Sequence, residues 1–575
     1  MGKFSLQHIG FAVFFTLLAA SCMLLDIPLF HDSRLISKWF GCYVIVLALS
    51  ASSFWWSSTL HTSIRITDIA VFVFAFYIFA FDYFNGDLSE AILLRGISLL
   101  LLYITFRQSI NDELFDTCLM IYLGLSSSLA IWGIVQFVFA AIHDGSLYTA
   151  VVGNYDNPAG FALTQSLALP VGIYLLGLSK RFEHQRLFIS IALGLVVLSL
   201  ALSFSRTGWL SLLCIGIYSF YILGKRRRKG FIVGAATIIF IVCCLYKQDS
   251  ADGRTYIAQC TWQQIADSPW WGHGRYGFIS GYMEYQAEYL SKHPDSRFAW
   301  LADNIHHPFN EWFYLVVRYG VVGLVLLIGV LLCLIPAIRR EVSAKSFLPI
   351  GLLIAILPFT LFSYPMQYPL AWMMLLISIA MQARYTKEII HFSCRQIIPT
   401  PSLLFACVAA PLLYRTIHAE LEWYDVSTQS LSGQTRYVLP RYEELHKRLK
   451  HSPYFLYNYA AELNYIGEYM RSQQILDKCM LRMNDYETHL LAASNHEHMG
   501  NYGLTEMHLM KASAMCPVRF VPLYQLAKLY GKMSRHEDQH CMAQQIIDKE
   551  EKVPSQRVTN IKEEMRYLLE SADFK

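Results

Sequence analysis

Residues 304–330 read NIHHPFNEWFYLVVRYGVVGLVLLIGV, a polar segment that opens directly onto a long apolar run. The run from residue 312 to residue 335 holds one charged residue, Arg318. An apolar helix of this length spans a hydrocarbon layer about 30 Å thick. The stretch therefore predicts a membrane helix that is entered from a polar loop.

Apolar runs of similar length recur along the rest of the chain. Of its 575 residues, 55% are hydrophobic and only 16% are charged, whereas soluble domains average about a quarter charged residues. We therefore predict an all-α fold, a polytopic membrane helical bundle of 12 or 13 spans. The other candidate spans are 9–25, 39–56, 66–84, 91–106, 114–142, 159–178, 187–203, 207–223, 231–246, 347–362, 369–383 and 402–419. The first run, residues 9–25, also resembles a signal peptide. Because further spans follow it directly, we interpret it as a membrane helix.

The net charge argues against nucleic-acid binding, and the spacing of the cysteines argues against a cysteine metal site. The net charge of +4 is too small for a nucleic-acid-binding surface. The 13 cysteines show no metal-ligand spacing, and most lie in apolar runs, as buried small hydrophobic residues do. We expect no nucleic-acid partner and no disulfide framework.

Basic residues lie on alternate loops between the predicted spans. Such residues concentrate on cytoplasmic loops, and the strongest cluster is KRRRK at residues 225–229. With the N-terminus inside, the loops at 339–345 and 384–395 are cytoplasmic as well. This arrangement places the loop 247–311 and the chain after about residue 420 outside the cytoplasm.

The chain after residue 435 is charged, rich in tyrosine and free of membrane-length runs. Ala460, Ala493 and Ala527 are 33 and 34 residues apart, and Gly467-Glu468-Tyr469 recurs as Gly500-Asn501-Tyr502. This period resembles tetratricopeptide repeats, which stack helix pairs into a docking surface; the alternative is an irregular helical bundle. We predict four regions: membrane helices (1–152), a membrane core with the external loop (153–383), a last membrane helix and linker (384–434), and a repeat-like helical tail (435–575).

The end of the external loop gathers side chains suited to proton transfer. His306 and His307 can accept a proton near neutral pH, as a general base must, and Glu311 could orient or tune one of them. The structural alternative is that Asn310 caps the next helix and Glu311 faces its positive end. A zinc site needs further ligands at suitable spacing, which the sequence does not offer, so we predict no metal.

Three arginines lie on the predicted external side. Arg206 stands in a very short turn between two spans, and Arg254 and Arg275 stand in the loop. Guanidinium groups bind diphosphate oxygens in bidentate geometry, so these arginines and a nearby histidine suit a diphosphate substrate at the membrane surface. The alternative role for Arg206 is an anchor that reaches the lipid headgroups.

A further external segment, GNYDNPAG at residues 153–160, contains Asn154 and Asn157. Their amides, with the carboxylate of Asp156, could hydrogen-bond a glycan. The segment could equally be a turn and helix start, with Asn157 as the cap and Pro158 at the first helical position.

Taken together, these motifs resemble the O-antigen ligase and polymerase superfamily. The resemblance rests on the asparagine-rich segment before a helix, on Ser-Arg-x-Gly-Trp at 205–209, and on His-x-x-Asn-Glu at 307–311. Nine residues then separate Asn310 from the Gly-x-x-Gly of 320–323, which is the most specific feature. The resemblance covers about residues 153–381.

Membership would imply a bacterial inner-membrane enzyme with a large periplasmic loop. It would transfer a glycan from undecaprenyl diphosphate to a hydroxyl of lipid A core, another glycan or a protein, without a cofactor. His307 would be the general base or orient the acceptor, Arg206 and Arg254 would hold the diphosphate, and the lipid tail would lie among the membrane helices and lipids. The full predicted set is catalytic His307, Glu311 and His306, with substrate-binding Arg206, Arg254, Arg275, Asn310, Asn154 and Asn157.

The chain also departs from the family pattern. Many ligases have histidine immediately before the asparagine, where this chain has Phe309, so His307 is the first choice and His306 the second. The departure leaves O-antigen polymerase and protein O-oligosaccharyltransferase as alternatives. The tail lies outside the basic ligase core and resembles an accessory domain that recruits a protein partner or the acceptor. Non-enzymatic alternatives are a membrane scaffold and a transporter, although few charges fall inside the spans, where transporters carry them.

Overall fold

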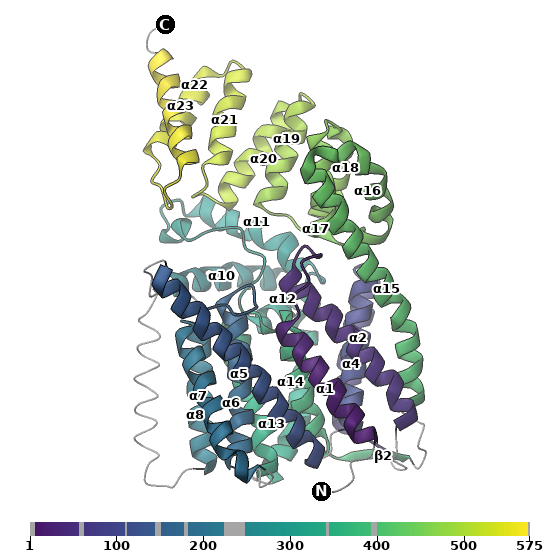
Figure 1. The fold of residues 1–575 in the computed structure, drawn as a ribbon. Coiled ribbons are helices and arrows are strands. Elements are labelled where there is room, and N and C mark those ends of the chain that lie inside the picture. The colour runs from purple at the N-terminus through teal and green to yellow at the C-terminus, as the bar shows by residue number, and fades with distance from the viewer. Residues whose placement is uncertain are drawn as a thin grey trace. The chain divides into compact units, whose positions relative to one another are not determined.

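The structure is a computed structural model that describes residues 6–56, 62–109, 112–143, 151–177, 182–223, 248–340, 344–392 and 399–572. In these residues the chain is almost entirely helical, which confirms the predicted all-α class (Figure 1). The described residues form one two-stranded antiparallel sheet, between β1 (Thr62–Arg65) and β2 (Glu388–Phe392). The chain divides into two units.

The first unit contains residues 1–246, 309–312 and 322–421 and carries the apolar helices. Each predicted span that the structure describes corresponds to a helix, whereas the predicted span 231–246 and the basic cluster 225–229 lie outside the described residues. The helices that lie in this unit or continue from it are α1 (Leu6–Leu24), α2 (Ser33–Trp56), α3 (Ile66–Phe84), α4 (Glu90–Ser109), α5 (Asp112–His143), α6 (Pro158–Gly177), α7 (Arg186–Leu202), α8 (Arg206–Leu223), α12 (Glu311–Arg340), α13 (Ala344–Phe362), α14 (Pro369–Ala383) and α15 (Pro399–Gln429).

Length and composition identify the chain as a multi-span membrane protein. Seven helices of the described residues are long and apolar enough to cross a bilayer, and three shorter apolar helices accompany them. Within the unit, α6 is the central helix, because it packs against α5, α7, α8 and α13. It is buried from Gly160 to Gly172, whereas α7 exposes large side chains such as Leu187 and Ile191, as a lipid-facing helix does.

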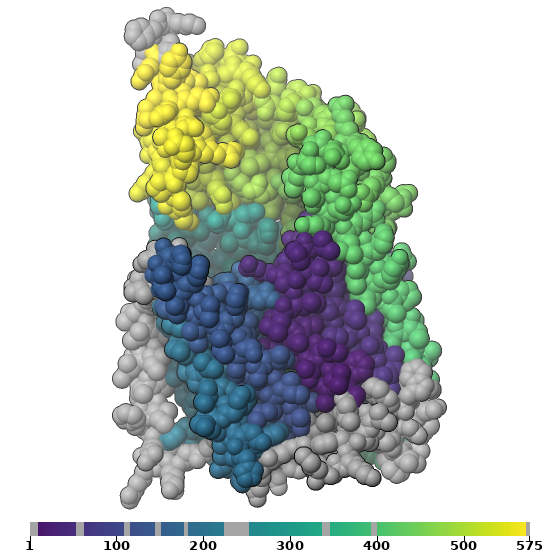
Figure 2. Space-filling view, in the orientation of Figure 1, coloured from purple at the N-terminus to yellow at the C-terminus, as the bar shows by residue number. Residues whose placement is uncertain are grey.

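The second unit contains residues 247–308, 313–321 and 422–575. Its loop part is folded into two helices, α10 (Gln248–Asp267) and α11 (Gly277–Lys292), which pack against each other. The tail helices follow, and their green-to-yellow side chains form a continuous surface in Figure 2. They are α16 (Thr435–Leu449), α17 (Pro453–Tyr465), α18 (Tyr469–Met480), α19 (Tyr486–His498), α20 (Tyr502–Met515), α21 (Val521–Lys532), α22 (His536–Asp548) and α23 (Gln556–Ala572).

The tail helices pack as consecutive pairs, α17 with α18, α19 with α20 and α21 with α22. The repeated alanines, Ala460, Ala493 and Ala527, are all buried in the first helix of a pair. The turn inside each pair contains a residue with positive φ, at Gly467, Gly500 and Ser534. The sequence period is therefore a structural period, while the assignment to the tetratricopeptide family stays a prediction.

Helix α12 is interrupted at Gly320, whose backbone is not helical (φ 65°, ψ −173°). The segment 269–274 takes over hydrogen bonds there: His273 N donates to Val317 O (2.7 Å) and Gly274 N donates to Arg318 O (3.1 Å). Val321 N, which a regular helix would direct to residue 317, donates instead to Pro269 O (2.8 Å). We call this set of three backbone hydrogen bonds the Gly320 clamp.

The Gly320 clamp requires glycine at two positions. A Cβ on Gly320 would lie 2.0 Å from Trp270 O, and one on Gly272 would lie 2.7 Å from both Gly320 N and Val317 O. Both residues also have positive φ, which non-glycine residues rarely adopt. Gly320 follows Asn310 after nine intervening residues. The backbone geometry of the Gly320 clamp explains why this position is a glycine in this chain.

We predict that Gly320→Ala destabilises the protein by about 3 kcal/mol or more, because the clash adds to the cost of the backbone conformation. The control is Gly329→Ala in the same helix, where an added Cβ meets no atom within 4 Å. Thermal unfolding of the purified full chain measures both. Equal melting temperatures for the two variants would contradict the clamp.

Candidate functional site

His307 lies in the second unit and is buried, with 6% of its surface exposed. Its ring centroid is 4.5 Å from that of Tyr314, one turn into α12. Burial, and then the charge of Arg318, lower the pKa of His307 to about 3. The imidazole is therefore neutral at physiological pH, able to accept a hydrogen bond but weakly basic.

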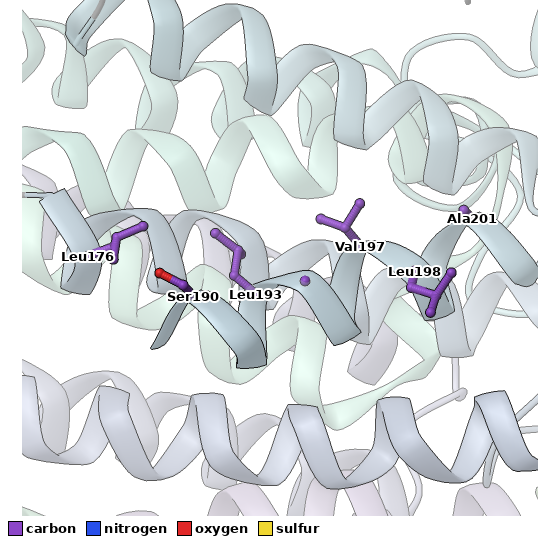
Figure 3. Close-up of a pocket in the computed structure, with 7 residues that line it drawn as sticks. Leu176, Ser190, Leu193, Val197, Leu198 and Ala201 are labelled. Carbon is purple, nitrogen blue, oxygen red and sulfur yellow. The ribbon is translucent and has the colours of Figure 1, made fainter. Parts of the chain in front are cut away.

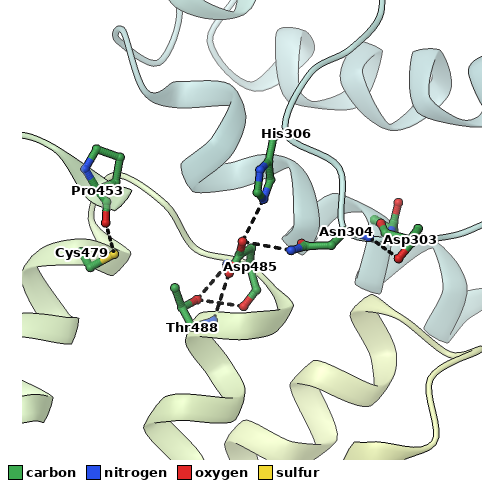
Figure 4. A network of polar contacts seen from close by, with 8 residues as sticks. Asp303, Asn304, His306, Pro453, Cys479, Asp485 and Thr488 are labelled. Atoms are coloured by element: carbon green, nitrogen blue, oxygen red, sulfur yellow. Dashed lines mark hydrogen bonds and ion pairs between the residues drawn. The ribbon is translucent and has the colours of Figure 1, made fainter. Parts of the chain in front are cut away.

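His306 differs from its neighbour in exposure and in partner. Its side chain is 39% exposed, and its Nε2 lies 2.9 Å from Asp485 Oδ2 at the start of α19 (Figure 4). Asn304 donates from Nδ2 to the same carboxylate oxygen at 3.1 Å. The two adjacent histidines thus occupy different environments: His307 is buried beside an aromatic ring, and His306 is held by a carboxylate.

Asn310 and Glu311 belong to the first unit and begin α12. The side-chain oxygen of Asn310 accepts a hydrogen bond from Trp312 N (3.0 Å), so the helix-capping role is observed. The Asn310 amide donates to Leu361 O (3.2 Å), and Glu311 Oε1 accepts from Met366 N (3.1 Å). Asn310 therefore binds the last turn of α13, and Glu311 binds the segment between α13 and α14.

Asn157 contacts the same connecting segment from another direction. Its Nδ2 lies 2.6 Å from Tyr364 Oη and 2.8 Å from Tyr368 Oη. Tyr368 in turn donates to Asp156 Oδ1 (2.7 Å). The Asn157 oxygen caps α6 by accepting from Gly160 N (2.9 Å), as the alternative interpretation of this segment expected.

Asn154 is fixed by a buried lysine of α2. Lys38 is fully buried and donates from Nζ to Asn154 O (2.7 Å) and Arg34 O (2.6 Å). The Asn154 side chain donates to Leu24 O (2.7 Å). The polar segment 153–157 is thus held against the N-terminal helices and the 361–368 segment, which gives it a fixed conformation.

The three predicted arginines lie on different elements. Arg206 is the first residue of α8, after a turn in which Phe204 has positive φ. Gly208 lets this end of α8 approach α6, because a Cβ there would lie 2.9 Å from Ala162 Cβ. Arg254 is on α10 and Arg275 lies two residues before the start of α11, and both are half-buried in the second unit.

The structure therefore brings together two groups of predicted residues. Asn157, Asn310 and Glu311 meet through residues 361–368 in the first unit, and His306 and His307 stand side by side in the second. Sequence reasoning missed the residues that organise these groups, namely Tyr364, Tyr368, Lys38 and Asp485. The only local signal was a short polar and aromatic interruption between two apolar runs, which could have drawn attention to the tyrosines.

An apolar groove of about 530 Å³ lies along the membrane helices of the first unit (Figure 3). It is lined by Leu176 of α6 and by residues of α7, of which Ser190 is the only polar one. Ala201, at one end of this lining, stands five residues before Arg206. The groove has the chemistry of a site for a hydrocarbon chain.

Comparison with known families identifies one segment. Residues 191–328 match the family model described as O-antigen ligase. The match includes all three predicted arginines, both histidines, Asn310, Glu311 and Gly320, and it excludes Asn154 and Asn157. None of the curated proteins matches the chain significantly. This segment of the chain is thus similar to the O-antigen ligase family, which supports a place in the O-antigen ligase and polymerase superfamily of membrane glycosyltransferases.

Proposed function

We propose that this protein transfers a glycan from an undecaprenyl-diphosphate carrier to an acceptor hydroxyl on the periplasmic face of the bacterial inner membrane. The observation that carries the proposal is the match of residues 191–328 to the O-antigen ligase family, since this segment holds both histidines and all three arginines. The distribution of basic loops supports the periplasmic assignment of the loop.

The donor would be bound through its two chemically different parts. Part of the isoprenoid tail would lie in the apolar groove lined by α6 and α7. The diphosphate suits Arg206, which begins α8 five residues after the groove residue Ala201, with Arg254 and Arg275 as further guanidinium groups. Such groups stabilise the negative charge that develops on the leaving diphosphate.

The acceptor would be handled by the histidine pair. In the transfer, the acceptor oxygen bonds to the anomeric carbon of the glycan, and the bond from that carbon to the diphosphate breaks. The proton of the hydroxyl must go to a base. His307 is neutral, because its pKa is lowered to about 3 by burial and by Arg318, so it can accept a hydrogen bond from the hydroxyl over the whole physiological pH range.

The polar residues of the first unit would support the transfer mainly by holding the starts of α6 and α12 in fixed positions. Asn310 and Glu311 hold the start of α12 to the 361–368 segment, and Asn157 holds the start of α6 to it. The exposed carboxylate of Asp156 remains the group of this cluster best suited to meet a sugar hydroxyl.

Deletion of the gene tests the function and identifies the acceptor. Loss of all glycan repeats from lipid A core is expected for a ligase. Lipopolysaccharide that keeps a single repeat would identify a polymerase, and loss of protein glycans alone would identify a protein O-oligosaccharyltransferase. Unchanged lipopolysaccharide and unchanged glycoproteins would contradict glycan transfer and favour a transporter or scaffold.

We predict that His307→Ala lowers the rate of transfer at least about 100-fold, because the acceptor hydroxyl loses the hydrogen bond that positions it. His307→Gln keeps a hydrogen-bonding side chain in the buried position. Comparison of its rate with that of His307→Ala separates the loss of the hydrogen bond from a purely structural effect of the alanine. The control is His293→Ala, an exposed histidine of the same loop. Wild-type transfer by a stably inserted His307→Ala protein would remove the proposed role.

We also predict that Arg206→Ala and Arg254→Ala raise the donor KM about tenfold or more, because each removes a charged contact to the diphosphate. The matched control is Arg297→Ala, whose side chain is 71% exposed and pairs with Asp252. Initial rates across a series of donor concentrations measure the effect. A donor KM that equals the Arg297→Ala value in both variants would rule out diphosphate binding by these arginines.

A further inference from the structure

The segment that carries the histidines is attached to the C-terminal helices at several points. Asp303 pairs with Arg519 (2.6 Å), and the buried Gln286 of α11 donates to both Asp303 O (2.9 Å) and Met515 O (2.7 Å). Glu284 of α11 pairs with Lys511 of α20 (2.6 Å). The loop and the tail are therefore one packed unit around residues 303–306.

Asp485 is the tail residue that reaches the histidine itself. It is 2% exposed and caps α19, since its Oδ1 accepts from Thr488 N (3.0 Å). Its other oxygen, Oδ2, forms hydrogen bonds with His306 Nε2 (2.9 Å) and Asn304 Nδ2 (3.1 Å) (Figure 4). One carboxylate thus serves two purposes: it begins a tail helix and fixes the histidine segment of the loop.

The charge state of Asp485 determines which nitrogen of His306 carries hydrogen. Burial by itself would raise the pKa of Asp485, but hydrogen bonds from His306, Thr488 N and Asn304 hold it below the ordinary value. The group is therefore a carboxylate that can only accept hydrogen bonds. A neutral His306 ring must then carry its hydrogen on Nε2, which leaves the lone pair of a base on Nδ1.

We propose that His306 is the general base of the transfer reaction and that Asp485 is the positioning residue that orients it, so that the C-terminal helices complete the catalytic site. This inference rests on the proposed function. In the step, the acceptor oxygen bonds to the anomeric carbon, the electron pair of the breaking bond leaves with the diphosphate, and the proton goes to His306 Nδ1.

The comparison of the two histidines supports this choice. His307 is 6% exposed and has a pKa of about 3, which makes it a weak proton acceptor. His306 is 39% exposed and has a carboxylate partner, the combination that orients a histidine base in other transferases and hydrolases. His307 would then hold the acceptor by a hydrogen bond while His306 takes the proton.

The proposal changes the role expected for the tail. A recruiting module would bind a partner and leave the chemistry to the membrane core. Here a tail side chain contacts a candidate catalytic side chain directly, and the surrounding ion pairs join the loop to α20 and to the segment after it. Changes in the tail at Asp485 should therefore affect kcat rather than partner binding alone.

The test uses Asp485→Asn in the full chain, purified in a lipid environment with an undecaprenyl-diphosphate-linked oligosaccharide as donor. Asparagine can keep the cap through its side-chain oxygen. Its amide would face His306 Nε2 as a donor and favour the opposite tautomer, with the hydrogen on Nδ1. We expect kcat to fall about 10- to 100-fold while the donor KM stays within about twofold.

Two further variants keep the result interpretable. Asp485→Ser retains a capping oxygen and removes the carboxylate, so it should show the same loss of kcat. Lys511→Met removes a loop-to-tail ion pair that does not touch the histidines, and it should keep kcat within about twofold of wild type. Equal losses in Lys511→Met and Asp485→Asn would mean that the tail acts only as general support, and would overturn the proposal.

A double-mutant cycle with His306→Gln decides whether Asp485 acts through His306. We expect Asp485→Asn to cause no additional loss of kcat in the His306→Gln background, since the two residues then act as one unit. Independent, multiplicative losses would overturn the proposal, as would wild-type kcat in Asp485→Asn. A wild-type protein that transfers no glycan would refute the proposed function itself, which separates the two failures.

Discussion

The constraint on which the loop unit depends is the Gly320 clamp. A membrane helix normally satisfies its own backbone hydrogen bonds, because lipid offers no alternative partners. Here α12 breaks its hydrogen-bonding pattern at Gly320, and residues 269–274 supply the missing partners through His273, Gly274 and Pro269. The loop before α12 is therefore joined by backbone contacts to the beginning of that helix, and the histidine segment lies on the chain between these two anchored parts.

Each of the two units fixes its own part of residues 304–311. Asn310 and Glu311 bind the 361–368 segment of the membrane unit, and Asp485 binds His306 within the loop and tail unit. A reaction that requires a hydroxyl, a base and a leaving group to meet gains rate mainly from such fixed positions. The same arrangement explains why two adjacent histidines differ, one buried and neutral, the other exposed and paired with a carboxylate.

Much of the fold could be predicted from local sequence. Each predicted span that the structure describes is a helix, because a bilayer requires about 20 apolar residues in every crossing segment. The repeat-like tail was also recognisable, since Ala460, Ala493 and Ala527 share one buried position in successive helix pairs. Tyr364 and Tyr368 were not predicted as part of the site, because their role depends on Asn157, more than 200 residues earlier in the chain.

By itself, the sequence determined the membrane class, the helical spans, the polar loop before α12 and the histidine pair, since each of these is encoded in hydrophobicity or in adjacent residues. Only the tertiary structure decided which histidine meets a carboxylate. His306 and Asp485 are separated by 179 residues, and they meet because α11 packs against α20. No local pattern records that contact, because the free energy that forms it comes from the packing of two distant segments.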